Sequence, residues 1–326
     1  MTDQTPPPER EFALSAPARF GLRLRLELMR TWWWAVPAAG TLAVVALFIG
    51  MGLAHIVDDD WEFAPGPLQA NQSRALDITA RLIFREVDQH QWVANDPVFK
   101  PSWWLDNMPN FQQGVVAASA RFARAMADVS DKGQGAEPEL ERAAGLLKYP
   151  GTVWKFDPRT SWAPTASSEK QYRNAARNLV DFNTRIADGA PLERNAATLQ
   201  ALVGALGKDL AAASAVIDQH LADSASALFD FEADDVFYAN KGKVYAYALI
   251  LREVGGDYGT LLAERGLAAQ WRQMFESLRA AAALEPAIVM NGVPDGSLLP
   301  SHLTAQGFYL LRARTQLSEI AEQLAR

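Results

Sequence analysis

The chain has 326 residues, of which 49% are hydrophobic, and its formal net charge is −7 at pH 7. It contains no cysteine, which excludes disulfides, thiolate metal sites and a cysteine nucleophile. Because nucleic-acid phosphates are bound by clustered cations, and this acidic chain has no such cluster, we expect no nucleic-acid partner.

A run without Lys, Arg, Asp or Glu extends from Thr31 to Val57. About 20 apolar residues, each rising about 1.5 Å, match a hydrocarbon core about 30 Å thick. We therefore predict a transmembrane helix at 31–57, which makes the lipid bilayer a partner and separates segments 1–30 and 58–326. The alternative is a signal peptide cleaved near Ala54, but the run exceeds the usual apolar region of about 7–15 residues. A buried core helix fits poorly, because the three adjacent tryptophans that open the run cannot all face one interior.

The charges on either side of the run predict its orientation. Five arginines precede it and four acidic residues follow it: Arg10, Arg19, Arg23, Arg25 and Arg30, then Asp58, Asp59, Asp60 and Glu62. Basic residues favour the cytoplasmic side of a membrane, so segment 1–30 should be cytoplasmic. Segment 58–326 then lies outside, which in a bacterium makes the chain a single-pass inner-membrane protein with a periplasmic domain. Residues 11–30 form either an amphipathic helix on the cytoplasmic leaflet or a disordered basic flank.

Small residues recur at every fourth position in the second half of the run, at Ala46, Gly50 and Ala54. This spacing places them on one helix face, where a second helix can approach closely, and it favours a homo-oligomer. Pro37 lies one turn into the run, where a missing N–H is best tolerated, so we expect the helix to begin near Thr31.

Segment 58–326 has apolar residues at helical spacing along most of its length. Seven segments show this pattern: 76–87, 115–129, 172–186, 199–221, 245–254, 267–284 and 300–324. The best strand-like stretch, 228–231, is short, so we predict an all-α fold, a multi-helix bundle behind one transmembrane helix. Segment 199–221 is either a helix of this bundle or a coiled-coil seam with another chain. Gly255 and Gly256 should end the helix that precedes them.

Two long segments, Trp92–Asn110 and Tyr149–Ser168, interrupt the helical pattern. Each has about 20 residues and is rich in proline and aromatic residues, and long loops of this kind are often functional. Four indoles and one acid in them are the candidate binding residues: Trp103, Trp104, Asp106, Trp154 and Trp162. Exposed rings would offer a platform for a glycan, a lipid or a partner protein. In the alternative, the two segments pack on each other and bury their indoles.

Few common catalytic motifs are available to this chain. No two of its four histidines lie within one helical turn, and no nucleophile elbow or dinucleotide fingerprint is present, so we expect neither a metal nor a cofactor. Carboxylates remain as candidates for the acids of a glycosidase: Asp96, Asp106 and Asp157 lie in the aromatic loops, and Glu86 and Asp88 precede them. Their spacing does not single out one pair. Glu232, Asp234 and Asp235 are better explained as acids in the first turn of a helix, opposing its dipole.

Three stretches resemble a known family. They are the Asp234–Tyr247 segment, Pro300–Leu303 followed by Gly307–Arg314, and Trp103–Asn110. Together with the single N-terminal anchor they resemble the proteobacterial inner-membrane family called domain of unknown function 2333. The resemblance implies a bacterial envelope protein and supplies neither an activity nor catalytic residues.

These observations favour a non-enzymatic scaffold or interaction module in the cell envelope, which associates with itself or with another envelope protein. The alternative is a periplasmic glycan or peptidoglycan hydrolase that uses carboxylates.

Overall fold

One long helix, α1 (Ala16–Ala54), contains residues 31–54 of the uncharged run. It belongs to a computed structural model that describes residues 16–54, 56–97, 100–104, 106–131, 135–156, 162–223, 232–286, 289–290 and 301–326. Its Trp32–Met51 stretch is long and apolar enough to cross a membrane, and none of it is buried within the protein. The prediction that Pro37 lies near the helix start is wrong, because α1 begins at Ala16. The helix therefore includes residues 16–30 of the basic segment as well as the apolar run.

Residues Leu53–Arg326 form a second, separate unit. Its elements are α2 (Arg74–Phe84), the π-helix η1 (Arg85–Gln89), the 3₁₀ helix η2 (Pro101–Trp104), α3 (Asn107–Ser130), α4 (Pro138–Leu147), α5 (Ser168–Ala187), α6 (Ala196–Asp223), α7 (Glu232–Asp257), α8 (Gly259–Glu264), α9 (Ala268–Ala282) and α10 (His302–Leu324). The described residues contain helices and no strand, which confirms the all-α prediction. The strand-like segment 228–231 lies outside the described residues.

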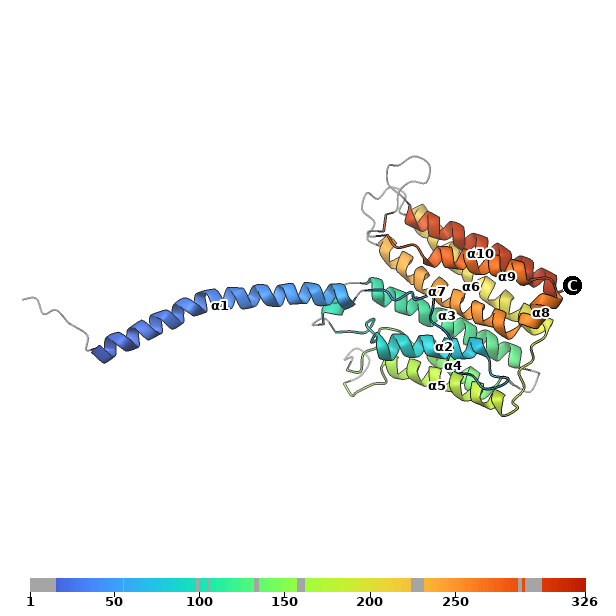
Figure 1. Ribbon diagram of the computed structural model, residues 1–326, viewed down its shortest axis with the longest axis horizontal. Coiled ribbons are helices and arrows are strands. Elements are labelled where there is room, and N and C mark those ends of the chain that lie inside the picture. The colour runs from blue at the N-terminus through green and yellow to red at the C-terminus, as the bar shows by residue number, and fades with distance from the viewer. Residues whose placement is uncertain are drawn as a thin grey trace, which may run out of the picture. The chain divides into compact units, whose positions relative to one another are not determined.

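Helices α3 and α7 form a central pair that two groups of helices share (Figure 1). On one side, α2, α4 and α5 complete a group, in which α4 packs on α3 and α2 packs on α7. On the other side, α6 packs on α3, α9 packs on α7, and α10 lies between α6 and α9. The result is a bundle in which successive long helices run up and down.

Two glycines let the central helices approach each other. A Cβ placed on Gly114 of α3 would lie 2.1 Å from the carbonyl oxygen of Ala239, and one on Gly242 of α7 would lie 2.0 Å from that of Phe111. These distances are far below van der Waals contact, so neither position accepts a larger residue without moving a helix backbone. The glycines therefore determine how closely α3 and α7 pack.

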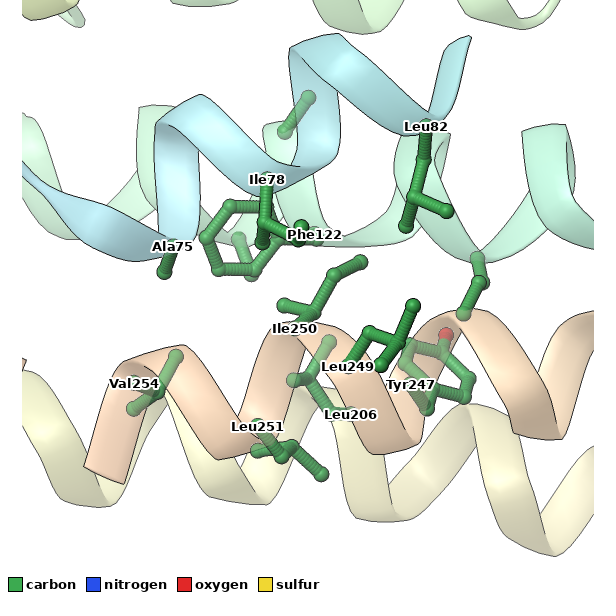
Figure 2. Packing of buried hydrophobic residues seen from close by; sticks show 14 of the residues in the cluster. Ala75, Ile78, Leu82, Phe122, Leu206, Tyr247, Leu249, Ile250, Leu251 and Val254 are labelled. Atoms are coloured by element: carbon green, nitrogen blue, oxygen red, sulfur yellow. The ribbon is translucent and has the colours of Figure 1, made fainter. Parts of the chain in front are cut away.

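Most of the apolar residues predicted from the sequence face one large core, and Ile217, Ala233, Phe237 and Leu303 form a second, smaller cluster. Figure 2 shows Ile78 and Leu82 of α2 on one side of the α7 residues and Leu206 of α6 on the other. The stripe of α6 is buried within its own chain at Leu199, Val203, Leu206, Leu210, Ala213 and Ile217. Segment 199–221 is therefore a helix of the bundle, as the first of its two interpretations held.

The glycine pair at the end of α7 does not stop the helix, so that prediction is wrong. Helix α7 continues through both residues to Asp257. A Cβ on Gly255 would lie 2.4 Å from Nε1 of Trp271, and one on Gly256 would lie 2.9 Å from Nε of Arg74. Glycine is needed at these two positions because the side chains of Trp271 and Arg74 lie against the α7 backbone, and not because the helix ends there.

Candidate functional site

An extended segment, residues 58–73, lies along the bundle before α2 begins; we call it the strap. Its beginning contacts the middle of α7, where the Asp59 carboxylate lies 2.8 Å from the Lys241 ammonium. Its end contacts the last turn of α7, where the Ser73 hydroxyl donates to Asp257 at 2.6 Å. The strap therefore follows α7 from Lys241 to Asp257 and connects the bundle to the segment that carries the apolar run.

Arg85 is one of the largest fully buried side chains and holds the start of the strap. Its guanidinium donates to the hydroxyl of Tyr245 at 2.8 Å and to the carbonyl of Asp58 at 3.1 Å. It also forms an ion pair of 2.9 Å with Glu86, whose side chain is fully buried, and lies 4.7 Å from the ring centre of Phe63. A buried charge requires such partners, because desolvation without them is costly.

Two cations of α7 hold the next residues of the strap. Lys241 is 3% exposed and donates to the carbonyl of Leu284 as well as pairing with Asp59. Arg252 donates to the carbonyl of Trp61 at 2.8 Å and to that of Phe63 at 2.5 Å. We refer to Arg85, Lys241 and Arg252 as the cation clamp, because each uses its charge to bind the strap.

An open hollow of about 550 Å³ lies beside the strap, and Trp61, Arg74, Arg252 and Glu253 are among the residues that line it. Both of its arginines are engaged with the buried carboxylate of Glu253, at 2.7 Å from Arg74 and 2.7 Å from Arg252. The charges of this hollow therefore compensate each other and stabilise the fold.

His90 lies at the end of the π-helix η1, between the strap and the bundle. Its Nε2 is 3.1 Å from the Asp58 carboxylate, and its Nδ1 is 3.4 Å from the Glu86 carboxylate. The hydrogen bond to Glu86 raises the pKa of His90 above its ordinary value, with the nearby Glu86 and Asp58 charges acting in the same direction. Single π-helical turns inside helices are frequent at functional positions, and this one directs Glu86 and His90 toward the strap.

The two aromatic loops contact each other through hydrogen bonds. The indole N–H of Trp92 donates to the carbonyl of Gly151 at 2.7 Å, and the Asn95 amide donates to that of Val153 at 2.9 Å. Trp92 is only 3% exposed and meets the ring of Tyr172 edge-on. One indole of the first loop is therefore part of the core.

The predicted binding residues have different surroundings. Trp162 is 95% exposed and Trp103 is 50% exposed, whereas Trp154 is half-buried with its ring 5.5 Å from that of Phe156. Asp106 is exposed at the N-terminus of α3. The side chain of Trp104, and Asp157 as a whole, lie outside the described residues. The loops thus combine buried and exposed rings.

The small residues of α1 are placed as helical spacing requires, and Ala46 is exposed while Gly50 is half-buried. The side chain of Ala54 lies outside the described residues.

The acids of α7 lie in its first turn, as the sequence indicated, and they meet an acid from another helix. The Asn110 amide of α3 donates to Asp235 at 2.7 Å. Burial, and then the charges of Asp106 and Asp235, raise the pKa of Asp234 to about 6. The pKa of Asp235 is also raised, first by burial and then by Asp106. In the part of the chain that the structure describes, no group of three His, Cys, Asp or Glu is arranged to hold a metal ion.

Sequence reasoning missed the cation clamp and His90, because the partners are far apart along the chain. The signal that was present is a charged pair, Arg85-Glu86, directly after the apolar positions of a buried helix. Charged side chains are almost never fully buried without partners, so a charge in such a position indicates a buried ion pair.

The fold and the site define a bundle of antiparallel helices with a candidate membrane span near the N-terminus. Helix α6 passes the same test of length and apolarity, but it is a packed helix of the bundle. The chain belongs to the family described as uncharacterized proteins conserved in bacteria, domain of unknown function 2333, whose model matches residues 30–206. This confirms the resemblance noted in the sequence. No curated protein and no solved structure matches the chain.

Proposed function

We propose that the protein is a single-pass inner-membrane scaffold whose helical domain lies in the periplasm. One observation carries the proposal: Trp32–Met51 is an apolar helical stretch of 20 residues, none of which is buried in the protein. Such a surface is stable in a bilayer and unfavourable in water. The arginines that precede it and the acids that follow it favour a cytoplasmic N-terminus.

The described charges of the domain support a role without catalysis. The cation clamp is engaged with the strap, and the two arginines of the hollow are engaged with Glu253. The exposed rings of Trp103 and Trp162 offer a surface for another envelope protein. In α1, the small-residue face of Ala46, Gly50 and Ala54 favours association with a second copy.

Cross-linking of the full-length protein in native membranes tests this role. We expect discrete oligomers, which Gly50→Leu should weaken because a large side chain separates the two helices. Val45→Leu, a change of similar character at another exposed position of α1, should leave the oligomers intact. A strictly monomeric protein that captures no envelope partner would argue against the scaffold.

A carboxylate-dependent glycan hydrolase is the second candidate, and the acids at the start of α7 favour it. Asp234, with a pKa of about 6, lies near Asp106 and Asp235, and an acid of that pKa can donate a proton near neutral pH. If the domain cleaves glycan strands, Asp234→Asn and Asp106→Asn should each abolish the release of soluble fragments from peptidoglycan. Unchanged release in both variants would eliminate these acids as the catalytic pair.

A further inference from the structure

The strap and the bundle meet at one side chain that can change charge near neutral pH. His90 faces the strap carboxylate of Asp58 with one ring nitrogen, and the buried carboxylate of Glu86 with the other. It is 22% exposed in its side chain, so protons reach it from solvent. The imidazole therefore bridges the first residue of the strap to the π-helix.

The chemistry of imidazole makes this position sensitive to protonation. The protonated ring has two N–H donors, one for each carboxylate. The neutral ring has one N–H, so its other nitrogen turns a lone pair toward a carboxylate that carries only acceptors. Protonation thus decides whether both contacts are attractive or only one.

The charges around His90 lead to the same conclusion. Arg85 contributes one positive charge, and Glu86 and Asp58 contribute two negative charges. Buried Tyr245 remains neutral, because burial raises the pKa of its phenol far above the ordinary value. The nearby Asp88 is paired with Arg173 of α5 at 2.6 Å. With His90 neutral the group carries an excess negative charge, and protonation of His90 balances it.

We propose that His90 is a proton-operated latch, which holds the start of the strap on the bundle when protonated and loosens it when neutral. The latch acts at Asp58, four positions after the last residue of α1. Its significance rests on the proposed function. In a membrane-anchored protein, the latch would make the motion of the domain relative to its membrane anchor depend on the pH outside the cell membrane.

Hydrogen exchange of the strap tests the latch in the full-length protein in lipid nanodiscs. After correction for intrinsic exchange, we expect the protection of amides 58–63 to fall between pH 5.5 and pH 8, as His90 loses its proton. His90→Gln, which cannot take up a proton, should give protection that does not depend on pH. His220→Gln, a matched change on α6, should keep the wild-type pH dependence.

A second measurement keeps the inference testable if His90→Gln fails to fold. In ¹³C-histidine-labelled wild-type protein, one imidazole signal should titrate above pH 6.5, and Asp58→Asn should lower its midpoint. Flat protection in the wild type, a retained fall in His90→Gln, or no histidine titrating above pH 6.5 would each overturn the latch. Maleimide labelling of α1 and the domain reports the topology separately, so flat exchange with the expected topology would remove the latch alone.

Discussion

Arg85 is a fully buried cation with partners on three segments of the chain. It is buried and satisfies Glu86, Tyr245 and the carbonyl of Asp58 at once. Arg85→Met should lower the free energy of unfolding by about 3–5 kcal/mol, because it leaves the Glu86 carboxylate buried without its partner. Chemical denaturation in detergent measures the change.

The matched control is Arg272→Met on α9, which removes an exposed arginine outside the strap contacts and should change stability by less than about 0.5 kcal/mol. Adding Glu86→Gln to Arg85→Met should recover part of the loss, because the unpaired charge is removed. If Arg85→Met and its control variant were equally stable, the buried Arg85–Glu86 pair would not hold the strap.

Substitution of Asp234 should raise the free energy of unfolding, whereas substitution of Arg85 lowers it, because the charge of Asp234 is unfavourable in the folded protein. Its folded pKa of about 6 exceeds the ordinary 3.8, so the carboxyl stabilises the fold when protonated and loses that contribution as pH rises from 3.8 through 6. Asp234→Asn should therefore raise stability at pH 7 by about 1 kcal/mol, after discounting for solvent at this half-buried position.

The pH dependence of this gain distinguishes it from a general effect of the substitution. At pH 3.5 the wild-type carboxyl is protonated in the folded state and mostly protonated in the unfolded state, so most of the advantage of Asp234→Asn should disappear. Urea titrations at pH 3.5 and pH 7 measure it. A gain of the same size at both values would mean that neither burial nor the charges of Asp106 and Asp235 disfavour the ionised carboxyl of Asp234.

At the scale of elements, the contact between α3 and α7 depends on glycine. Gly242→Ala should lower stability by about 2–4 kcal/mol, because its methyl group would overlap the Phe111 carbonyl and push the central helices apart. Gly204→Ala in α6 is the matched control, since its Cβ meets nothing within 4 Å. The control should stabilise by roughly 0.5–1 kcal/mol through helix propensity, and thermal melts compare the two. Similar small effects from both changes would refute the close packing.

The helices could be predicted from the sequence where an apolar stripe recurs over several turns, as in α6 and α10. Helix α4 was missed because it is short and its apolar positions are mainly alanine and leucine between acids. The end of α7 was misjudged because glycine serves both helix termination and close packing, and only the position of Trp271 distinguishes the two.

The candidate site could be predicted only in part, because its partners come from different elements. The aromatic loops were recognised as unusual, yet nothing in the spacing of Trp92 indicates its bond to Gly151. The contact of Arg85 with Asp58 and Tyr245 joins a strap, a π-helix and α7, so it depends on tertiary packing that local periodicity does not encode.

At the scale of the whole molecule, an apolar helix is followed by a strap that buried cations hold on the helical bundle. Without the cation clamp, the strap would connect the membrane span to the bundle as a flexible linker. Without the span, the clamp would not attach the bundle to a membrane. The central proposal is therefore the topology, in which α1 would cross the inner membrane and the bundle would lie outside it.

Cysteine accessibility tests this topology most directly, because the natural chain has no cysteine. Ala201→Cys places a thiol at an exposed position of the bundle, and Thr2→Cys places one near the N-terminus. In cells with a permeabilised outer membrane, an impermeant maleimide should label the Ala201→Cys protein at once and the Thr2→Cys protein only after lysis. Protection of the Ala201→Cys protein until lysis, or its recovery as soluble material lacking the segment before residue 55, would contradict the account.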